Sequence, residues 1–198
     1  MKIVFLFCLY LSGFLGFSQE WELKRSANNI QVYTRELDST NINEYKAVLR
    51  ANTSAEKALK ILTNGDNLKS WNHKTPESEI LQKISENEYI FYMKSDLPWP
   101  LSDRDHICRV TVNELGFNTY KLNISPADPS FTTAEKNAIR IDNFSGFWLI
   151  NTIDDNTVEI TQQMYGDPKG VIPAWLVNSL ITSFPFHSFE NLKEILEN

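Results

Sequence analysis

Two cysteines among 198 residues are too few for a disulfide-rich scaffold. Glycine and proline are also scarce, with 7 and 8 residues, which excludes collagen-like and low-complexity chains. Basic residues number 19 against 25 acidic ones, so the formal net charge is −6 and a broad nucleic-acid-binding surface is not expected. No internal repeat is visible, which argues against a solenoid or propeller. What is present, 42% hydrophobic and 12% aromatic residues, predicts one globular domain with a large apolar interior.

The sequence also lacks the short motifs that mark common enzyme classes. It contains no GxSxG, no HExxH and no phosphate-binding glycine loop. Its three histidines, His73, His106 and His187, are far apart and do not have the spacing of metal ligands. We therefore expect no catalytic residues, no metal site and no cofactor, and interpret the chain as a binding protein.

The N-terminal segment has the pattern of a secretory signal peptide. A positive start, Met1-Lys2, precedes an apolar run over residues 3–17, and Gly16-Phe17-Ser18 places small residues where a signal peptidase cleaves. The run is too short for a membrane span, and an uncleaved N-terminal anchor is the alternative. We expect a signal peptide at residues 1–18, export to a bacterial periplasm or to the medium, and a folded domain over residues 20–198.

Apolar and polar residues alternate over several segments, which predicts strands with one buried face each. Turn residues between neighbouring segments predict antiparallel hairpins. The predicted strands cover residues 30–34, 45–51, 79–84, 89–94, 105–112, 117–124, 138–150 and 157–165.

Two helices are predicted from capping signals and helical periodicity. Thr53-Ser54-Ala55-Glu56 is a capping box, which opens a short helix. A long amphipathic helix begins at Pro173, a good first helical residue. Its apolar positions recur at i, i+3, i+4 and i+7 and are Val177, Leu180, Ile181 and Phe184. The order of elements predicts an α+β domain, in which a curved antiparallel sheet wraps around the C-terminal helix.

This architecture can leave space inside. One helix, about 10 Å across, has to cover the apolar faces of all the strands. Empty apolar space loses dispersion contacts, which favours a ligand cavity, and a fully packed core is the alternative. The candidate lining residues are Phe91, Met93, His106, Cys108, Val110, Tyr120, Leu122, Trp148, Ile160, Gln162 and Met164 from the sheet, and Val177, Leu180, Ile181 and Phe184 from the helix.

Four groups of residues, in the same order along the chain, resemble motifs of START domains, the StAR-related lipid-transfer family. They are WEL at residues 21–23 with IQVY at 30–33, PWPLSDRD at 98–105, IR at 139–140 followed by GFWLI at 146–150, and DPKGVIPAWLVN at 167–178. The resemblance covers about residues 20–197. It implies a helix-grip fold, a sheet that grips the C-terminal helix around a hydrophobic tunnel, and non-covalent binding and transfer of a lipid.

Three polar residues fall on the faces that would line such a tunnel. Arg104 could contact a lipid head group, or it could form an ion pair that fixes the proline-rich loop before it. His106 and Gln162 could bond a ligand or the neighbouring backbone, because a buried polar group needs a partner. Some sterol-binding relatives carry a second arginine six residues after Arg104. Val110 stands there in this chain, so a sterol-type anchor is in doubt.

Three further residues have predicted roles. Cys108, the only cysteine after signal removal, is expected to be a buried apolar side chain, with a nucleophile as the alternative. Arg140 is expected to tie its strand to Asp142 or Asp167. Trp99 either packs as a loop hinge or touches a membrane.

We expect a monomer that binds a lipid or another hydrophobic small molecule, contacts membranes transiently and does not bind nucleic acid. A second hypothesis is a helix-grip enzyme, similar to a polyketide cyclase or hydrolase, that uses Arg104, His106 or Cys108. It requires at least two of these residues to lie within hydrogen-bonding distance. A third hypothesis is a domain that senses a ligand without transferring it.

Overall fold

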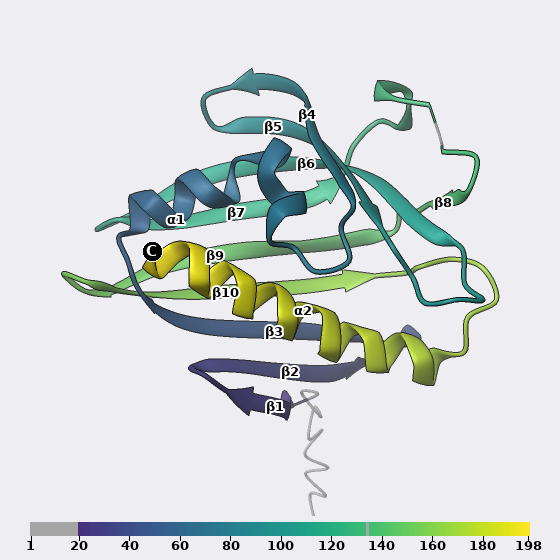
Figure 1. Ribbon diagram of the computed structural model, residues 1–198, viewed down its shortest axis with the longest axis horizontal. Coiled ribbons are helices and arrows are strands. Elements are labelled where there is room, and N and C mark those ends of the chain that lie inside the picture. The colour runs from purple at the N-terminus through teal and green to yellow at the C-terminus, as the bar shows by residue number, and fades with distance from the viewer. Residues whose placement is uncertain (1–19, 134) are drawn as a thin grey trace, which may run out of the picture.

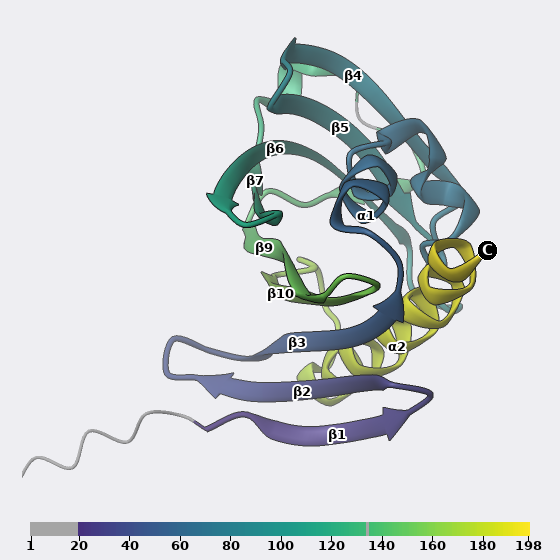
Figure 2. The ribbon, with the colours of Figure 1, turned by 90° about the vertical axis from the view of Figure 1, so that its left-hand side faces the viewer.

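The computed structural model describes residues 20–133 and 135–198, so the predicted signal peptide lies outside the described residues. The described chain folds into one strongly curved sheet, with helices α1 (Ala55–Leu62) and α2 (Ala174–Glu197) on its concave side (Figures 1 and 2). Two short 3-10 helices are η1 (Gly65–Ser70) and η2 (Pro129–Phe131). The strands are β1 (Glu22–Ala27), β2 (Ile30–Leu37), β3 (Thr40–Asn52), β4 (Glu77–Ser85), β5 (Glu88–Ser95), β6 (Asp103–Gly116), β7 (Thr119–Pro126), β8 (Ala138–Arg140), β9 (Phe144–Asp154) and β10 (Thr157–Gly166).

The sheet has the spatial order β1-β2-β3-β10-β9-β7-β6-β5-β4, and all neighbours in this order are antiparallel. The short strand β8 pairs in parallel with β6 beside this path. The predicted α+β helix-grip fold is confirmed, but the sheet has ten strands, two more than the eight predicted segments. The edge strand β1 was not predicted because all six of its residues are exposed, so its sequence carries no alternation of apolar and polar positions.

The predicted strand over residues 138–150 is wrong, because the structure divides it into two strands with different neighbours. β8 lies beside β6, whereas β9 pairs with β7 and β10. Between them the Ile141 amide donates to the Asp105 carbonyl oxygen at 2.9 Å, and the Asp167 amide donates to the Asn143 carbonyl oxygen at 2.8 Å. The residues between β8 and β9 are thus held by hydrogen bonds to β6 and to the segment after β10.

The turn between β6 and β7 also lies later than predicted. Phe117 and Asn118 have positive φ angles of 50° and 53°, the backbone geometry of a tight two-residue hairpin turn. β7 therefore begins at Thr119 and not at residue 117.

Helix α1 begins within the predicted capping signal, but its N-cap is Ser54 and not Thr53, the first residue of the predicted capping box. The Ser54 hydroxyl accepts a hydrogen bond from the Lys57 amide at 3.2 Å and so satisfies one free N–H group of the first turn. The buried face of the helix, with Ala58 and Leu62, packs against β7 and β9. This contact covers one end of the concave face.

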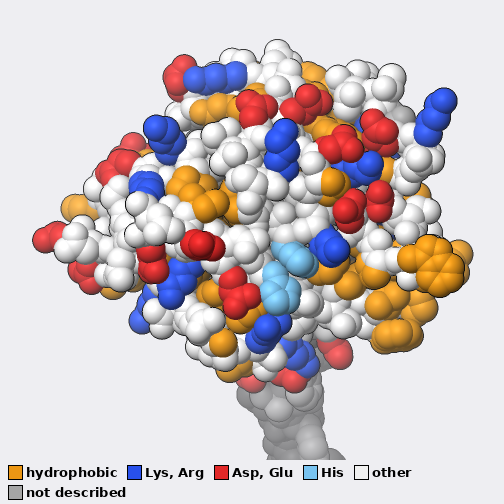
Figure 3. Space-filling model, in the orientation of Figure 1, with side chains coloured by type: hydrophobic (Ala, Val, Ile, Leu, Met, Phe, Trp, Pro, Cys, Tyr) orange, Lys and Arg blue, Asp and Glu red, His pale blue; other side chains and the backbone are white. Residues whose placement is uncertain are grey.

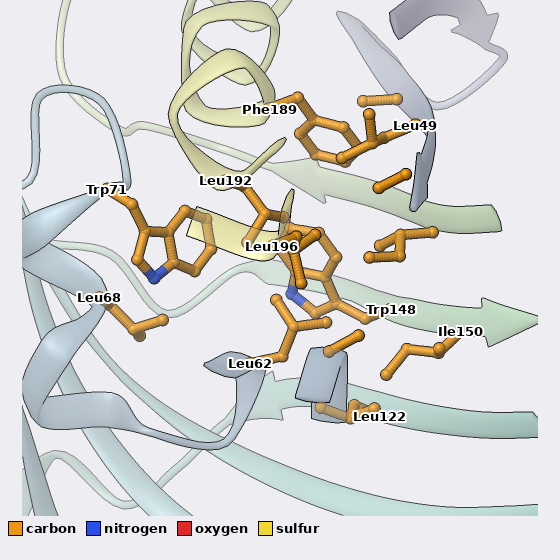
Figure 4. Packing of buried hydrophobic residues seen from close by; sticks show 14 of the residues in the cluster. Leu49, Leu62, Leu68, Trp71, Leu122, Trp148, Ile150, Phe189, Leu192 and Leu196 are labelled. Carbon is orange, nitrogen blue, oxygen red and sulfur yellow. The ribbon is translucent and has the colours of Figure 1, made fainter. Parts of the chain in front are cut away.

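The second helix is unevenly buried. Its C-terminal half carries Phe186, Phe189, Leu192 and Leu196, which are fully buried in the main core. Phe189 stacks on Trp148 with ring centroids 5.5 Å apart, as Figure 4 shows for this cluster. Its N-terminal half is mostly half-buried, with only Val177 and Pro185 buried. The core therefore fills one end of the domain, and the other end lies under the beginning of α2.

Candidate ligand-binding site

Two adjoining chambers lie on the concave side of the sheet, the outer one beneath the N-terminal half of α2 and the inner one beside α1 and η1. The outer chamber has a volume of about 260 Å³ and reaches the segments before β6 and before α2, with Leu97 and Ile172 in its wall. The inner chamber, of about 180 Å³, extends toward α1 and η1, where Leu62 and Leu68 line it. The cavity interpretation of the sequence is therefore confirmed at one end of the fold, and the packed-core interpretation holds at the other.

Most of the predicted lining residues face these chambers. In the outer chamber they are Arg104, Val177, Leu180, Ile181 and Phe184. In the inner chamber they are Phe91, Met93, Cys108, Val110 and Trp148. Both chambers share His106, Gln162 and Met164. Contact of these residues with a ligand stays a prediction.

Three predicted lining residues do not reach the chambers. Leu122 and Ile160 are fully buried in the packed core, and Tyr120 packs against its edge. They share the inward face of their strands with true lining residues, but α1 covers β7 at this end of the sheet. Figure 4 shows Leu122 in the same packed cluster as Leu62 of α1.

Arg104 connects the proline-rich loop before β6 to the segment before α2, at the outer chamber. Its Nε donates to the Pro168 carbonyl oxygen at 2.5 Å, and its Nη2 donates to the Lys169 carbonyl oxygen at 2.9 Å. Its Nη1 donates to the Ser102 carbonyl oxygen. The predicted ion pair is wrong, because within the described residues the guanidinium is bound by backbone carbonyls and by no carboxylate. The loop-fixing role remains, and it connects the proline-rich loop to the segment that leads into α2.

His106 lies between the two chambers and is half-buried. Its ring packs edge-on against Phe144, with centroids 5.2 Å apart. Burial lowers the pKa of His106 to about 4, so the ring is neutral at pH 7. Within the described residues neither ring nitrogen has a hydrogen-bond partner. A neutral imidazole offers one donor and one acceptor, and here both are free to meet a guest.

Gln162 is oriented by a residue that we did not single out from the sequence. The Tyr45 hydroxyl donates to Gln162 Oε1 at 3.0 Å, across the pairing of β3 with β10. Burial raises the pKa of Tyr45, so the phenol stays protonated and keeps this role. The amide nitrogen of Gln162 is left as an open donor. Tyr45 shares strand parity with the buried Ala47 and Leu49, which is the signal that could have identified it.

Cys108 is a buried residue of the inner chamber wall, as expected for an apolar cysteine. Burial raises the pKa of its thiol to about 12, which disfavours the reactive thiolate. No hydrogen bond joins Arg104, His106 and Cys108 in the described part of the chain. The geometry that the enzyme hypothesis requires is therefore not formed.

Further lining residues come from positions without a periodic signal. Phe144 and Ile141 follow the break between β8 and β9, and Asn72 belongs to the irregular segment after η1. Trp71 is buried in the inner chamber wall, 6.2 Å from Trp148 between ring centroids. Such residues could not be placed before the chain path between the strands was known.

Other kinds of site are not formed by the described residues. Over residues 20–133 and 135–198, no group of three or more histidine, cysteine, aspartate or glutamate side chains is placed to hold a metal ion. In the same residues no helix combines the length and the apolar character needed to cross a membrane.

Comparison with known proteins agrees with this geometry. The START domain family model matches residues 11–198. An uncharacterized protein of Pseudomonas aeruginosa is 26% identical over 182 residues, which are 91% of this chain and 88% of that protein. The crystal structure of a STAR-related lipid transfer protein fragment from Xanthomonas axonopodis has a TM-score of 0.81 and 27% identity, over 89% of this chain and 98% of that chain. The phosphatidylcholine transfer protein of Mus musculus is 23% identical over 164 residues, 80% of this chain and 75% of that protein.

Proposed function

We propose, because this chain belongs to the START domain family, that it binds one hydrophobic ligand in the two chambers and carries it between membranes. The observation that carries the proposal is the pair of apolar-walled chambers at the end of the domain that the core leaves open. Each methylene group that enters them gains about 0.8 kcal/mol by leaving water. Binding of this kind needs no catalytic group.

A surface at the outer chamber supports transient membrane contact. Trp99 and Trp175 are 92% and 72% exposed, and Val171 is fully exposed. We call these three residues the rim patch. Trp99 and Val171 belong to the two segments whose Leu97 and Ile172 line the outer chamber, and Trp175 lies in the first turn of α2. Figure 3 shows hydrophobic side chains gathered at the right-hand end of the molecule, where Figure 1 places the beginning of α2. Exposed tryptophan is typical of surfaces that enter the membrane interface.

Ligand exchange takes place at this end of the domain. The Arg104 hydrogen bonds hold the proline-rich loop to the segment before α2, and both must separate, or α2 must shift, to admit a ligand. A membrane that solvates the rim patch lowers the cost of that opening, because apolar side chains are then exposed to lipid and not to water.

The protein acts outside the cytoplasm of a bacterium, as a monomer. The support is the signal-peptide pattern of residues 1–18. Mass spectrometry of the protein recovered from a periplasmic fraction tests this, with Gln19 as the expected first residue. A cytoplasmic protein that retains Met1 would contradict it.

Extraction of the purified protein into organic solvent, followed by mass spectrometry, tests the ligand. We expect one predominant hydrophobic compound at close to one molecule per protein. Ile181→Trp, which fills the outer chamber, should reduce its amount at least tenfold. Ile84→Trp, on an exposed part of β4, is the matched control and should retain the ligand. Equal ligand content in both variants would overturn the proposed site.

A vesicle exchange assay separates a carrier from a sensor. A carrier accelerates movement of a fluorescent lipid from donor to acceptor vesicles in proportion to its concentration, whereas a sensor binds without acceleration. We expect acceleration, because the rim patch places the chamber opening at the membrane.

A further inference from the structure

The wall that the two chambers share is mostly polar. Six residues line both chambers, and five of them carry a hydrogen-bonding side chain; the sixth is Met164. We call these five residues the neck, and they are Tyr45, Asn72, Ser95, His106 and Gln162. They come from β3, β5, β6, β10 and the segment after η1, so they surround the passage from several sides.

The neck has unused hydrogen-bonding capacity. Within the described residues, no partner is found for the Ser95 hydroxyl, for the His106 ring nitrogens or for the Gln162 amide nitrogen. The Asn72 side chain donates to Thr75 Oγ1 at 2.8 Å, and its carbonyl oxygen stays open. Polar groups enclosed in a protein require partners, so a guest that reaches the neck meets several donors and acceptors.

The neck carries no charge at neutral pH. Its members are a phenol, two amides, a hydroxyl and an imidazole that burial keeps neutral. Among the described residues the chamber walls contain no carboxylate, and their only guanidinium is that of Arg104. Arg104 already donates to the carbonyl oxygens of Pro168, Ser102 and Lys169. A buried phosphate or ammonium group would therefore find no free counter-charge.

The chambers are apolar on both sides of the neck. Toward the surface the walls are formed by side chains such as Phe144, Ile181 and Phe184. Toward α1 they are formed by side chains such as Phe91, Val110 and Trp148. A guest that crosses the neck thus has hydrocarbon on either side of its polar group.

From this arrangement we infer that the ligand is an uncharged lipid whose ester, amide, ketone or hydroxyl group lies within its length and is bonded at the neck. This inference rests on the proposed function and specifies the class of compound that the chambers take. It distinguishes this chain from a carrier that buries a charged head group.

A competition from one membrane tests the inference. The delipidated protein is equilibrated with dioleoyl phosphatidylcholine vesicles that contain equal amounts of hexyl octanoate and n-pentadecane, an ester and a hydrocarbon of the same chain length. The protein is isolated again, and its bound molecules are quantified by mass spectrometry and gas chromatography. We expect the ester to be enriched over the hydrocarbon by roughly threefold to tenfold relative to the vesicles, the effect of one or two net hydrogen bonds. Phosphatidylcholine should be a minor component.

Two matched variants locate the selectivity. Ser95→Ala and Cys108→Ala each remove one heavy atom, the first from the neck and the second from the inner chamber wall. Ser95→Ala should lower the ester-to-hydrocarbon ratio about threefold, whereas Cys108→Ala should lower both bound amounts and leave the ratio unchanged. His106→Phe, which keeps a ring but removes both nitrogens, should act as Ser95→Ala does.

The outcomes separate the two proposals. Phosphatidylcholine as the predominant bound lipid, no ester enrichment, or a ratio that Ser95→Ala and His106→Phe leave unaltered would overturn the inference and leave the proposed function standing. Failure of all three compounds to bind would overturn both.

Discussion

Arg140 holds Asp105 with two hydrogen bonds, from Nε to Oδ1 at 2.9 Å and from Nη2 to Oδ2 at 2.7 Å, and Asp105 is completely buried. The expected partners Asp142 and Asp167 are wrong, since Asp142 pairs with Lys169 and Asp167 accepts from the Lys169 amide. The pair locks β8 to β6, where Arg140 lies opposite Asp105 in register.

Arg140→Met should therefore destabilise the domain strongly. It leaves the buried Asp105 carboxylate without a cation, and breaking such a pair costs about 3–5 kcal/mol in the free energy of unfolding. Urea denaturation measures the loss. Arg109→Met, which breaks the more exposed pair with Glu88, is the matched control and should cost at most about 1 kcal/mol. Equal, small losses in both variants would contradict the role of the buried pair.

Gly146 is required by the close approach of β9 to β10. A Cβ atom at this position would lie 2.2 Å from the Gln163 carbonyl oxygen and 2.2 Å from Met164 Sδ. Gly146→Ala should cost about 1–3 kcal/mol of unfolding free energy and weaken ligand binding, because Met164 lines both chambers.

Gly166→Ala is the control for this substitution. Its added Cβ would meet only the Phe144 Cβ at 3.5 Å, an ordinary contact, so its unfolding free energy should change by about 0.5 kcal/mol or less. If both alanine variants lose the same stability in thermal unfolding, then steric crowding does not explain why residue 146 is a glycine.

The sequence predicted which side chains of each strand point inward, but it did not predict whether they pack in the core or line a chamber. Strict alternation placed His106 and Cys108 inward because the side-chain period of a strand is fixed by its backbone. The same alternation placed Leu122 and Ile160 inward, yet these fill the core. Whether an inward residue meets a helix or a chamber depends on where α1 and α2 cross the sheet, and no local pattern encodes that.

Hydrogen bonds and ion pairs between residues far apart in the sequence were also not predicted. The Arg140–Asp105 pair spans 35 residues and depends on the parallel register of β6 with β8, a strand of three residues. Tyr45 could have been included on strand parity, but its bond to Gln162 requires the pairing of the sequence-distant β3 and β10. The motifs from residues 98 to 178 were more informative, because they converge at the outer chamber through Arg104, Pro168 and Ile172.

Loss of the rim patch should slow lipid transfer without emptying the chambers. Trp99→Ser with Trp175→Ser removes two exposed aromatic side chains, and transfer between vesicles should fall about tenfold, the effect of roughly 1.4 kcal/mol. Phe117→Ser is the control, since Phe117 is also fully exposed but lies in the β6–β7 turn. A similar decrease in the control would show that nonspecific hydrophobic adsorption, and not the rim patch, causes the membrane contact.

Acid should destabilise the domain through His106. Its pKa in the folded state, about 4, lies below the ordinary value of about 6.5. As the pH falls below about 6.5 the unfolded chain binds the proton first, so the stabilisation present at neutral pH is lost progressively. The loss is complete below about pH 4 and amounts to about 3 kcal/mol.

Urea unfolding at pH 7, 5.5 and 4 measures this slope. His106→Phe cannot bind the proton and should lose about 3 kcal/mol less than the unmodified protein over the same interval. His187→Gln, at a half-exposed histidine of α2, should retain most of the acid sensitivity. Since an uncharged His106 is also what the neck offers to a ligand, bound hexyl octanoate should be released over the same pH range in the unmodified protein and retained longer by His106→Phe, although that variant binds it more weakly at pH 7.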